Sequence, residues 1–489
     1  MKKILVVILY LSLYCSSLHS QWVTQTVPDS ASILNSINFI NTNNGVSTGW
    51  DFGATNITSG RALYTTNAGA NWISGTVPYT CRIIASVKYI TPQILYGTGA
   101  LNLSIDKHKS GDYDFMGRLK PSVSKNISYA GNNAKGAFFK STNGGLNWLQ
   151  YGTVPADCSY FTYMDFINEN TGVVLADVGP NGTNFMNILR TTNGGLTWSP
   201  TLTENFNGQI VFIKYASDNV IFAGGFYNID TVIHNVIFKS TNGGTNWTTQ
   251  LRDTVYSNAV HFINSQTGFT AGGESEGPST NSTSGHVYKT TDQGISWNKV
   301  LAADTIAFQG INFFGETGVG IAFGNKNFNG SSYIPYAFRT SNFGLTWSVQ
   351  RLSENDDPLV INSFMLDKYN YYISGIGANS GAILHTTNGG SVGVTAITGF
   401  TPDKFSLEQN YPNPFNPTTT IKFNVQTKSN IFLKVYDING KELTTLLNDV
   451  KTEGSYEVNF DASAYPSGIY YYRLISDSYS ETRKMILIK

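Results

Sequence analysis

The side chains of this chain that could carry acid–base chemistry are a few scattered carboxylates. Hydrolysis of a glycosidic bond needs two carboxyl groups about 5 to 10 Å apart, one of them with a raised pKa. The candidate acids are Asp165, Asp177, Glu274 and Glu276. Asp177 and Glu274 follow soon after expected strands, so they could point toward a shared axis or rim. No motif pairs any two of these acids, so we expect no catalytic set and interpret them more simply as solvated loop acids.

The histidines and cysteines show no spacing typical of a nucleophilic or metal site. The histidines beyond the N-terminal segment are His108, His234, His261, His286 and His385. His261 and His385 fall at repeat positions that other copies fill mainly with Asp, Asn, Lys or Arg, which indicates surface or lining roles. Cys81 and Cys158 stand in matching contexts and are either small buried residues or a disulfide, which needs Cα atoms within about 7 Å. We expect neither a metal nor a cofactor.

These residues are embedded in a repeated sequence. The stretch Arg190-Thr-Thr-Asn-Gly-Gly-Leu-Thr-Trp198 occurs seven times with small changes. From Trp148 onward, four successive intervals between its tryptophans are 50, 49, 50 and 50 residues. The seventh copy, at Thr386–Gly390, stops before its tryptophan. A fixed period of about 50 residues indicates an array of equal structural units.

Each copy is typical of a tight turn between two strands. A short Asn or Asp side chain can accept hydrogen bonds from backbone N–H groups two residues further on. The glycine two places later permits a positive φ, and the tryptophan begins the next strand and buries a large ring. The residues at these positions are Asn67, Gly69 and Trp72; Asn143, Gly145 and Trp148; Asn193, Gly195 and Trp198; Asn242, Gly244 and Trp247; Asp292, Gly294 and Trp297; Asn342, Gly344 and Trp347; and Asn388 and Gly390.

A second motif precedes each of these turns. It reads aromatic-Ile-Asn, a few polar residues, Thr-Gly and then an apolar strand, as in Phe166 to Val173 and Phe262 to Phe269. Looser versions bring the number of copies to seven. Two hairpins per repeat make four strands in about 50 residues, which is the content of a propeller blade. We therefore predict an all-β protein with a seven-bladed β-propeller over residues 21–396.

The ring of blades needs a closing strand, and the start of the mature chain supplies a candidate. Trp22 stands five residues before Val27-Pro28, the same spacing that separates Trp72 from Val77-Pro78 after the first turn. Because the seventh copy lacks its tryptophan, we predict that Trp22 and its strand complete blade seven. Closure of this kind hides the strand edges that an open array would expose.

The recurring turn resembles the Asp-box, or bacterial neuraminidase repeat, with the pattern Ser/Thr-x-Asp-x-Gly-x-x-Trp. Asn replaces Asp in six of the seven copies. The propeller part is similar to three families that share this box: sialidases, xyloglucan-cleaving glycosidases and photosystem II assembly factors. The resemblance implies the fold and not the activity. A sialidase also needs an arginine cluster and a Tyr–Glu pair, and here Arg190 and Arg339 belong to the turns. Each stretch from Ser/Thr to Trp is called a box turn below.

Composition and the N-terminus indicate an exported protein. Charged residues make up 13% of the 489 residues, about half the usual share of roughly 25%, and the net charge is zero. A zero balance argues against nucleic-acid binding. Lys2 and Lys3 followed by the short apolar run 4–13 predict a signal peptide over residues 1–20. The run is too short to span a bilayer, and we expect no transmembrane segment in the mature chain.

Blade two contains an insertion of about 26 residues near 101–135, rich in mixed charges and aromatic residues. A loop of this composition is either a binding loop or a surface excursion. After Gly390 the period ends, and residues 397–404 are expected to be a linker.

The segment 405–489 opens with a proline-rich motif and continues with alternating strands. The motif residues are Pro412, Asn413, Pro414, Phe415, Asn416 and Pro417. Proline fixes φ and removes backbone donors, so the entry is extended and rigid. The strands are expected at 419–425, 430–436, 455–460, 468–474 and 483–488, which predicts a small β-sandwich.

This segment closely resembles the C-terminal sorting domain of type IX secretion cargo in the Bacteroidetes lineage. The matching stretches are the proline-rich motif, Val435 to Lys441, Gly468 to Leu474 and the basic-apolar end Lys484 to Lys489. The resemblance implies passage across the outer membrane, with the secretion machinery as a partner, and a location outside the cell or on its surface.

These observations favour a secreted or surface-displayed propeller that binds a protein or a glycan. The alternatives are a secreted glycoside hydrolase that acts on polysaccharide and a purely structural surface protein.

Overall fold

The structure, a computed structural model, describes the following residues: 22–28, 32–52, 57–102, 135–178, 185–205, 208–229, 232–253, 255–275, 283–304, 306–328, 332–352, 358–377, 380–387, 394–397, 404–462 and 465–488. The expected signal peptide, most of the 101–135 insertion, Glu276, His108, Asn388 and Gly390 lie outside these segments.

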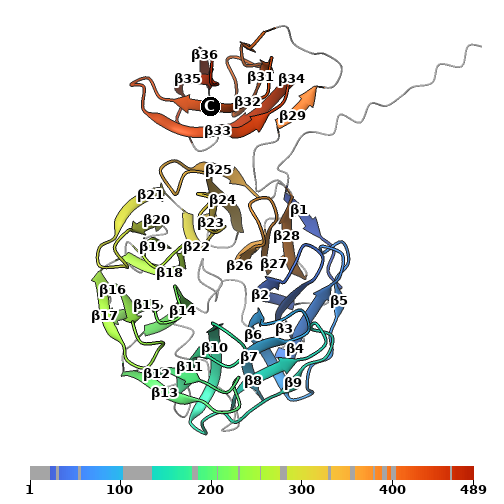
Figure 1. The fold of residues 1–489 in the computed structure, drawn as a ribbon, viewed down its shortest axis with the longest axis vertical. Coiled ribbons are helices and arrows are strands. Elements are labelled where there is room, and N and C mark those ends of the chain that lie inside the picture. The colour runs from blue at the N-terminus through green and yellow to red at the C-terminus, as the bar shows by residue number, and fades with distance from the viewer. Residues whose placement is uncertain are drawn as a thin grey trace, which may run out of the picture.

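All regular elements in the described segments are β-strands (Figure 1). The strands of the ring are β1 (Trp22–Gln25), β2 (Ser32–Phe39), β3 (Gly45–Phe52), β4 (Ile57–Thr65), β5 (Ile73–Ser74), β6 (Cys81–Tyr89), β7 (Leu95–Leu101), β8 (Lys135–Ser141), β9 (Leu149–Gln150), β10 (Cys158–Phe166), β11 (Gly172–Val178), β12 (Phe185–Thr191), β13 (Ser199–Asn205), β14 (Gly208–Tyr215), β15 (Ile221–Ile229), β16 (Val232–Ser240), β17 (Thr248–Asp253), β18 (Val255–Phe262), β19 (Gly268–Ser275), β20 (Thr283–Thr290), β21 (Asn298–Asp304), β22 (Ile306–Phe313), β23 (Gly320–Phe328), β24 (Ser332–Thr340), β25 (Ser348–Arg351), β26 (Leu359–Met365), β27 (Tyr371–Ile376) and β28 (Gly381–Thr386).

These strands form seven four-stranded antiparallel sheets arranged around a common centre (Figure 1). Blade one holds β2 to β5, and each later blade takes the next four strands in order up to β25. In each of these blades the first strand lies nearest the centre and the fourth at the rim. The predicted all-β, seven-bladed propeller is confirmed.

The seventh blade is completed by β1. Its strand order is β1-β28-β27-β26, and Trp22 lies opposite Thr386. The Trp22 ring meets the Tyr371 ring edge-on, with 5.7 Å between the ring centroids. Trp22 also belongs to a buried cluster with Phe323 of blade six and Leu384 of blade seven. The first and last strands of the ring are thus paired side by side, in the position that the repeat spacing assigns to Trp22.

Aromatic pairs join neighbouring blades near the centre. Phe39 at the end of β2 stacks on Tyr372 of blade seven with ring centroids 3.8 Å apart, and Phe262 stacks on Phe222 at 4.2 Å. In both pairs the aromatic residue of the aromatic-Ile-Asn motif contacts the second strand of the preceding blade. Such pairs contribute about 0.5–1.5 kcal/mol beyond the area they bury.

Every inner strand carries a register shift in its middle. In β2 the shift lies between Leu34 and Ser36, and equivalent shifts occur in the other six inner strands. In six blades the residue opposite this bulge is a glycine. A Cβ at Gly49 would lie 1.7 Å from the carbonyl oxygen of Ile33, so the close approach of the two strands requires glycine. Bulges of this kind bend a strand and re-aim its side chains.

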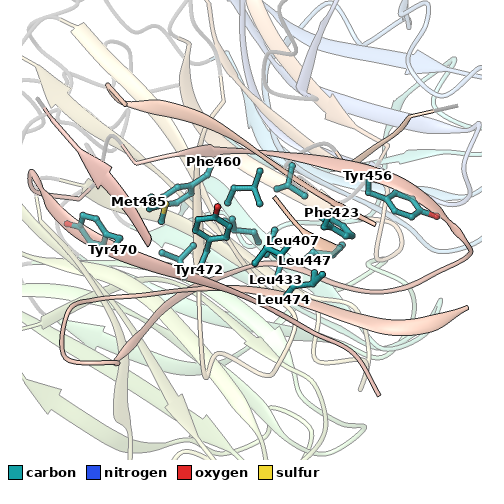
Figure 2. Close-up of a cluster of buried hydrophobic side chains, with 14 of the residues drawn as sticks. Leu407, Phe423, Leu433, Leu447, Tyr456, Phe460, Tyr470, Tyr472, Leu474 and Met485 are labelled. Carbon is teal, nitrogen blue, oxygen red and sulfur yellow. The ribbon is translucent and has the colours of Figure 1, made fainter. Parts of the chain in front are cut away.

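The C-terminal strands form two packed sheets. They are β29 (Val394–Ile397), β30 (Ser406–Leu407), β31 (Thr418–Val425), β32 (Ser429–Tyr436), β33 (Glu442–Lys451), β34 (Gly454–Asp461), β35 (Gly468–Ile475) and β36 (Ser480–Leu487). The sheet orders are β29-β34-β31-β30 and β33-β32-β35-β36. Figure 2 shows their shared core, in which Phe423, Leu433 and Tyr472 are fully buried. The predicted sandwich is confirmed.

Three strands of this sandwich, β29, β30 and β33, are absent from the sequence-based expectation. β33 was not predicted, because two register shifts between β32 and β33 interrupt its alternation of apolar and polar residues. β29 pairs with β34 although its residues fall at the expected border between propeller and linker. The C-terminal sheet therefore recruits chain from before residue 405. Among the described residues, the structure contains no helix with the length and apolar character of a membrane span.

Candidate functional site

The box turns share one hydrogen-bond pattern. In the first, the Thr65 hydroxyl accepts from the Gly69 N–H at 2.9 Å, and Asn67 Oδ1 accepts from the Asn71 N–H at 2.9 Å. The same two bonds recur in the next five turns. The Asn or Asp therefore reaches an N–H four residues on, and not two as the sequence suggested.

The backbone of each box turn explains this longer reach. The six described glycines have φ between +77° and +98°, and the residue before each of them also has a positive φ. Two successive left-handed residues curl the chain, which brings the later N–H onto the side-chain oxygen. The tryptophans that follow are buried at Trp72, Trp148, Trp198 and Trp347 and half-buried at Trp247 and Trp297. The box turns thus have a structural role in blades one to six, where the structure describes them.

Cationic side chains at the residue before three of the box turns reach the next blade. Arg190 Nε donates to the Gly243 carbonyl at 2.7 Å, and Lys239 Nζ donates to the Gln293 carbonyl at 2.8 Å. Lys289 makes the equivalent bond to the following box turn. Each acceptor is the first left-handed residue of the next turn. These cations therefore fasten one blade to its neighbour.

The junction between blades seven and one uses a different donor. Gln25 Nε2 of β1 donates to the Ala68 carbonyl at 3.0 Å, and Gln25 Oε1 accepts from Trp72 Nε1 at 2.9 Å. His385, which occupies the position of the cations, stacks on Tyr372 with ring centroids 4.0 Å apart. Burial lowers the pKa of His385 to about 4, so this imidazole is neutral at physiological pH.

Near the centre, one residue per inner strand forms what we call the axial ring. It is the next-to-last residue of each inner strand, and its members are Asn38, Lys88, Asp165, Lys214, His261, Asn312 and Phe364. Several of these side chains cross to the next blade. Asn38 Oδ1 accepts from the Tyr89 N–H at 3.0 Å, and Asn312 Nδ2 donates to Ser363 Oγ at 2.7 Å.

Asp165 is the most tightly held member of the axial ring. Lys88 Nζ donates to one of its carboxylate oxygens, and the Tyr215 N–H donates to the other at 2.9 Å. Burial alone would raise the pKa of Asp165, but the charges of Lys88 and Lys214 and these hydrogen bonds hold it below its usual range. Asp165 is therefore a buried, ionised residue that joins three blades. The position could have been found from the sequence by aligning the residue before each aromatic-Ile-Asn motif.

His261 neighbours this charged group. Its environment lowers the pKa to about 4, mainly through burial and also through the charge of Lys214. Of the other histidines, His286 is buried in β20 and His234 lies partly exposed in β16. The described part of the chain contains no group of three or more His, Cys, Asp or Glu residues that could hold a metal ion.

The remaining candidate acids do not come together. Asp177 lies opposite Tyr160 on the hairpin that also carries Asp165, but toward its other end. Glu274 pairs with Val255 in blade five, two blades away. The structure therefore places these three acids at separate points of the ring.

The two cysteines are free and buried, so the structure favours small buried residues over a disulfide. Burial raises the pKa of both thiols to about 12.

The proline-rich motif is fastened to the last strand of the sandwich. Phe415 is buried and exchanges two 2.9 Å backbone hydrogen bonds with β36, donating to the Ile486 carbonyl and accepting from the Ile488 N–H. Asn413 Oδ1 accepts from the Ile486 N–H at 2.9 Å. The Thr419 hydroxyl donates to the Pro412 carbonyl at 2.7 Å. The motif and the chain end thus form one structural unit.

Comparison with known proteins identifies this unit. Residues 409–489 match the family described as "Secretion system C-terminal sorting domain". A search of curated proteins gives no match. Among solved structures, the Niastella koreensis GH74 enzyme is similar at 14% identity, over 94% of this chain and 67% of that chain, with a TM-score of 0.52.

YCF48 from Cyanidioschyzon merolae is similar at 15% identity, over 75% of this chain and 98% of that chain, with a TM-score of 0.48. At such identities the structural likeness to the GH74 enzyme shows the propeller fold alone. Residues 409–489 are a type IX secretion sorting domain, and the protein is therefore destined for the cell surface or the extracellular space.

Proposed function

We propose that this protein is a recognition module, exported by the type IX system, whose propeller binds a protein or glycan partner. The observation that supports this most is the state of Asp165. This carboxylate of the axial ring is buried, ionised and bonded on both oxygens, so it fastens blades and does not serve as an acid or base.

The binding end of the ring follows from strand register. Thr65 pairs with Gly45, so the first hairpin turn and the box turn of a blade lie at the same end. Leu101 pairs with Lys135 at the opposite end of blade two, where the 101–135 insertion joins the strands. Because the 101–135 insertion, the candidate binding loop, joins the strands there, we assign partner binding to the end that carries the insertion.

The experiment replaces residues 103–134 with a short Gly-Ser linker, which the direct pairing of Leu101 with Lys135 accommodates. A matched control shortens residues 276–282, which join the paired residues Ser275 and Thr283 at the same end of blade five. Binding is measured to arrays of glycans, purified cell-wall polysaccharides and surface proteins. We expect the blade-two variant to lose a ligand that the wild type and the control retain. A blade-two variant that binds like the wild type contradicts the assignment.

Polysaccharide hydrolysis is the other candidate from the sequence. Asp165 lies opposite Val173, and Asp177 lies four residues further along β11, which corresponds to about 13 Å at about 3.3 Å per residue. Glycosidases need their two carboxyl groups about 5 to 10 Å apart. This pair therefore does not support hydrolysis. Release of reducing sugar by the purified protein, abolished by Asp177→Asn, would replace our proposal with this one.

A further inference from the structure

A polar cavity lies at the box end of the ring, between the box turns of blades three and four. Its volume is about 140 Å³. It is lined by Arg190, Thr192, Thr197, Ser199, Thr201 and Thr245. One guanidinium and five hydroxyl groups thus surround the space, and none of these lining residues is acidic.

The hydrogen bonds around the cavity leave donors free for a ligand. Arg190 uses its Nε on the Gly243 carbonyl, so its two terminal nitrogens are not needed for this contact between blades. Thr197 Oγ1 accepts from Asn193 Nδ2 at 2.9 Å, which leaves the hydroxyl proton of Thr197 available. A planar guanidinium with a neighbouring hydroxyl donor suits an oxyanion, because charge-assisted hydrogen bonds are the stronger ones.

The cavity also offers acceptors. The Thr245 hydroxyl donates to the Asn242 carbonyl at 3.0 Å, so its oxygen presents lone pairs to the cavity. The Thr201 hydroxyl, by contrast, donates to the Ile188 carbonyl and accepts from Trp247 Nε1. Thr201 therefore lines the cavity but has its hydrogen bonds within the protein. Donors and acceptors side by side suit a ligand that carries hydroxyl groups next to its negative charge.

Among the box turns of blades one to six, which the structure describes, a hydroxyl at the position of Thr245 occurs only in blade four. At the position of Thr245, four other box turns carry an exposed aliphatic residue: Leu146, Leu196, Ile295 and Leu345, with exposed fractions of 40%, 47%, 75% and 78%. A leucine at residue 245 would replace a hydroxyl that lines the cavity with an apolar side chain. The fold therefore tolerates an aliphatic side chain at this position, and the polar cavity arises because threonine takes its place.

We propose that this cavity binds the sulfate or carboxylate group of an acidic sugar residue. The guanidinium of Arg190 and the hydroxyl of Thr197 hold the oxyanion, and Thr245 accepts from a sugar hydroxyl. The site lies at the end of the ring opposite the blade-two insertion, so it is independent of the partner binding proposed above.

The test is calorimetric titration of the full-length mature chain with three probes: a chondroitin sulfate tetrasaccharide, an oligogalacturonate and uncharged maltotetraose. We expect binding of at least one acidic probe, weakened by added salt, and none of maltotetraose. The first probe reports a sulfate, and the second reports a carboxylate. Equal binding of the neutral sugar, or no binding of either acidic probe, overturns the proposal.

Thr245→Leu is the decisive variant, because it installs the residue that related turns already carry. It should lower the affinity for the acidic probe at least tenfold while the midpoint of thermal unfolding stays unchanged. Arg190→Gln should lower the affinity similarly, and Arg190→Lys should retain part of it. Leu345→Thr, at the corresponding turn between blades five and six, is the matched control and should bind like the wild type. Binding that survives Thr245→Leu within a factor of two rejects this cavity.

The blade-two linker variant separates the two proposals. It should keep the acidic-sugar affinity even where it loses its partner, because the two sites lie at opposite ends of the ring. Loss of acidic-sugar binding in this variant assigns that binding to the insertion and overturns the cavity.

Discussion

Blades one and two fasten to their neighbours differently from blades three, four and five. The outer strands β5 and β9 have two residues each, whereas β13, β17 and β21 have six or seven. After each short strand the backbone crosses over: Thr76 bridges to Asn147 of the next box turn, and Thr153 bridges to Thr197. In the longer blades the chain stays on its own sheet, and a lysine or arginine makes the contact instead.

The comparison shows that one repeated turn can be fastened in two ways. In the first way, found in blades one and two, backbone groups make the contact between blades. The residue directly before the blade's own box turn is therefore not needed for that contact. Lys140 of blade two, for example, lies over the rings of Tyr96 and Tyr151 with its Nζ 5.7 and 4.7 Å from their centroids. The second way uses side chains and therefore depends on a single residue per blade.

The largest effect is expected where the two kinds of contact meet, at the box turn of blade three. Gly195 has φ +87°, and a Cβ there would lie 2.3 Å from Phe138 Cε1 in blade two. Gly195→Val should therefore cost about 3 kcal/mol through left-handed strain and overpacking. Urea denaturation measures this loss in the free energy of unfolding. Gly440→Val, at a positive φ with no atom within 4 Å, is the control and should cost about 1 kcal/mol. Equal losses at both glycines would mean that contact between the blades contributes nothing.

A smaller effect is expected at the junction of blades seven and one, which follows neither pattern. The pKa of His385 in the folded protein, about 4, lies below its usual value of 6.5. Its contribution to stability is therefore complete above about pH 6.5 and is lost as the pH falls toward 4. We expect a loss on the order of 2 kcal/mol over this range. The midpoints of urea unfolding at pH 7.5 and 4.5 measure this loss of stability. The difference between the two midpoints should be smaller in the His385→Gln variant. An identical pH dependence in the variant would show that protonation at this junction is not the cause.

The smallest effects test the comparison directly. Lys239→Met removes a side-chain contact between blades four and five and should cost about 1.5 kcal/mol, in the range for a hydrogen bond from a charged group. Lys140→Met should cost about 0.5 kcal/mol, because the backbone already joins blades two and three there. The measurement is the free energy of unfolding of each variant relative to the wild type. Equal losses in the two variants would contradict the distinction between the two kinds of blade.

The overall architecture could be predicted because each repeat marks its own turns. Gly69 and its equivalents need a positive φ, and the tryptophan spacing counts the blades and places Trp22. The candidate sites could not be predicted in the same way. The cavity depends on Thr245 differing from its equivalents and on how far Arg190 extends, and spacing within one repeat shows neither. The sequence predicts a loop acid at Asp165, because its partner, Lys88, belongs to another blade and no motif connects the two residues.

The pairing of β1 with β28 has a consequence for export. The propeller cannot finish folding until the residues around Trp22 and those around Thr386 are present in the same compartment, because each supplies the hydrogen-bonding edge that the other lacks. Proteolytic removal of β1 on the outside of the cell would leave β28 without this hydrogen-bonding partner and would open the seventh blade.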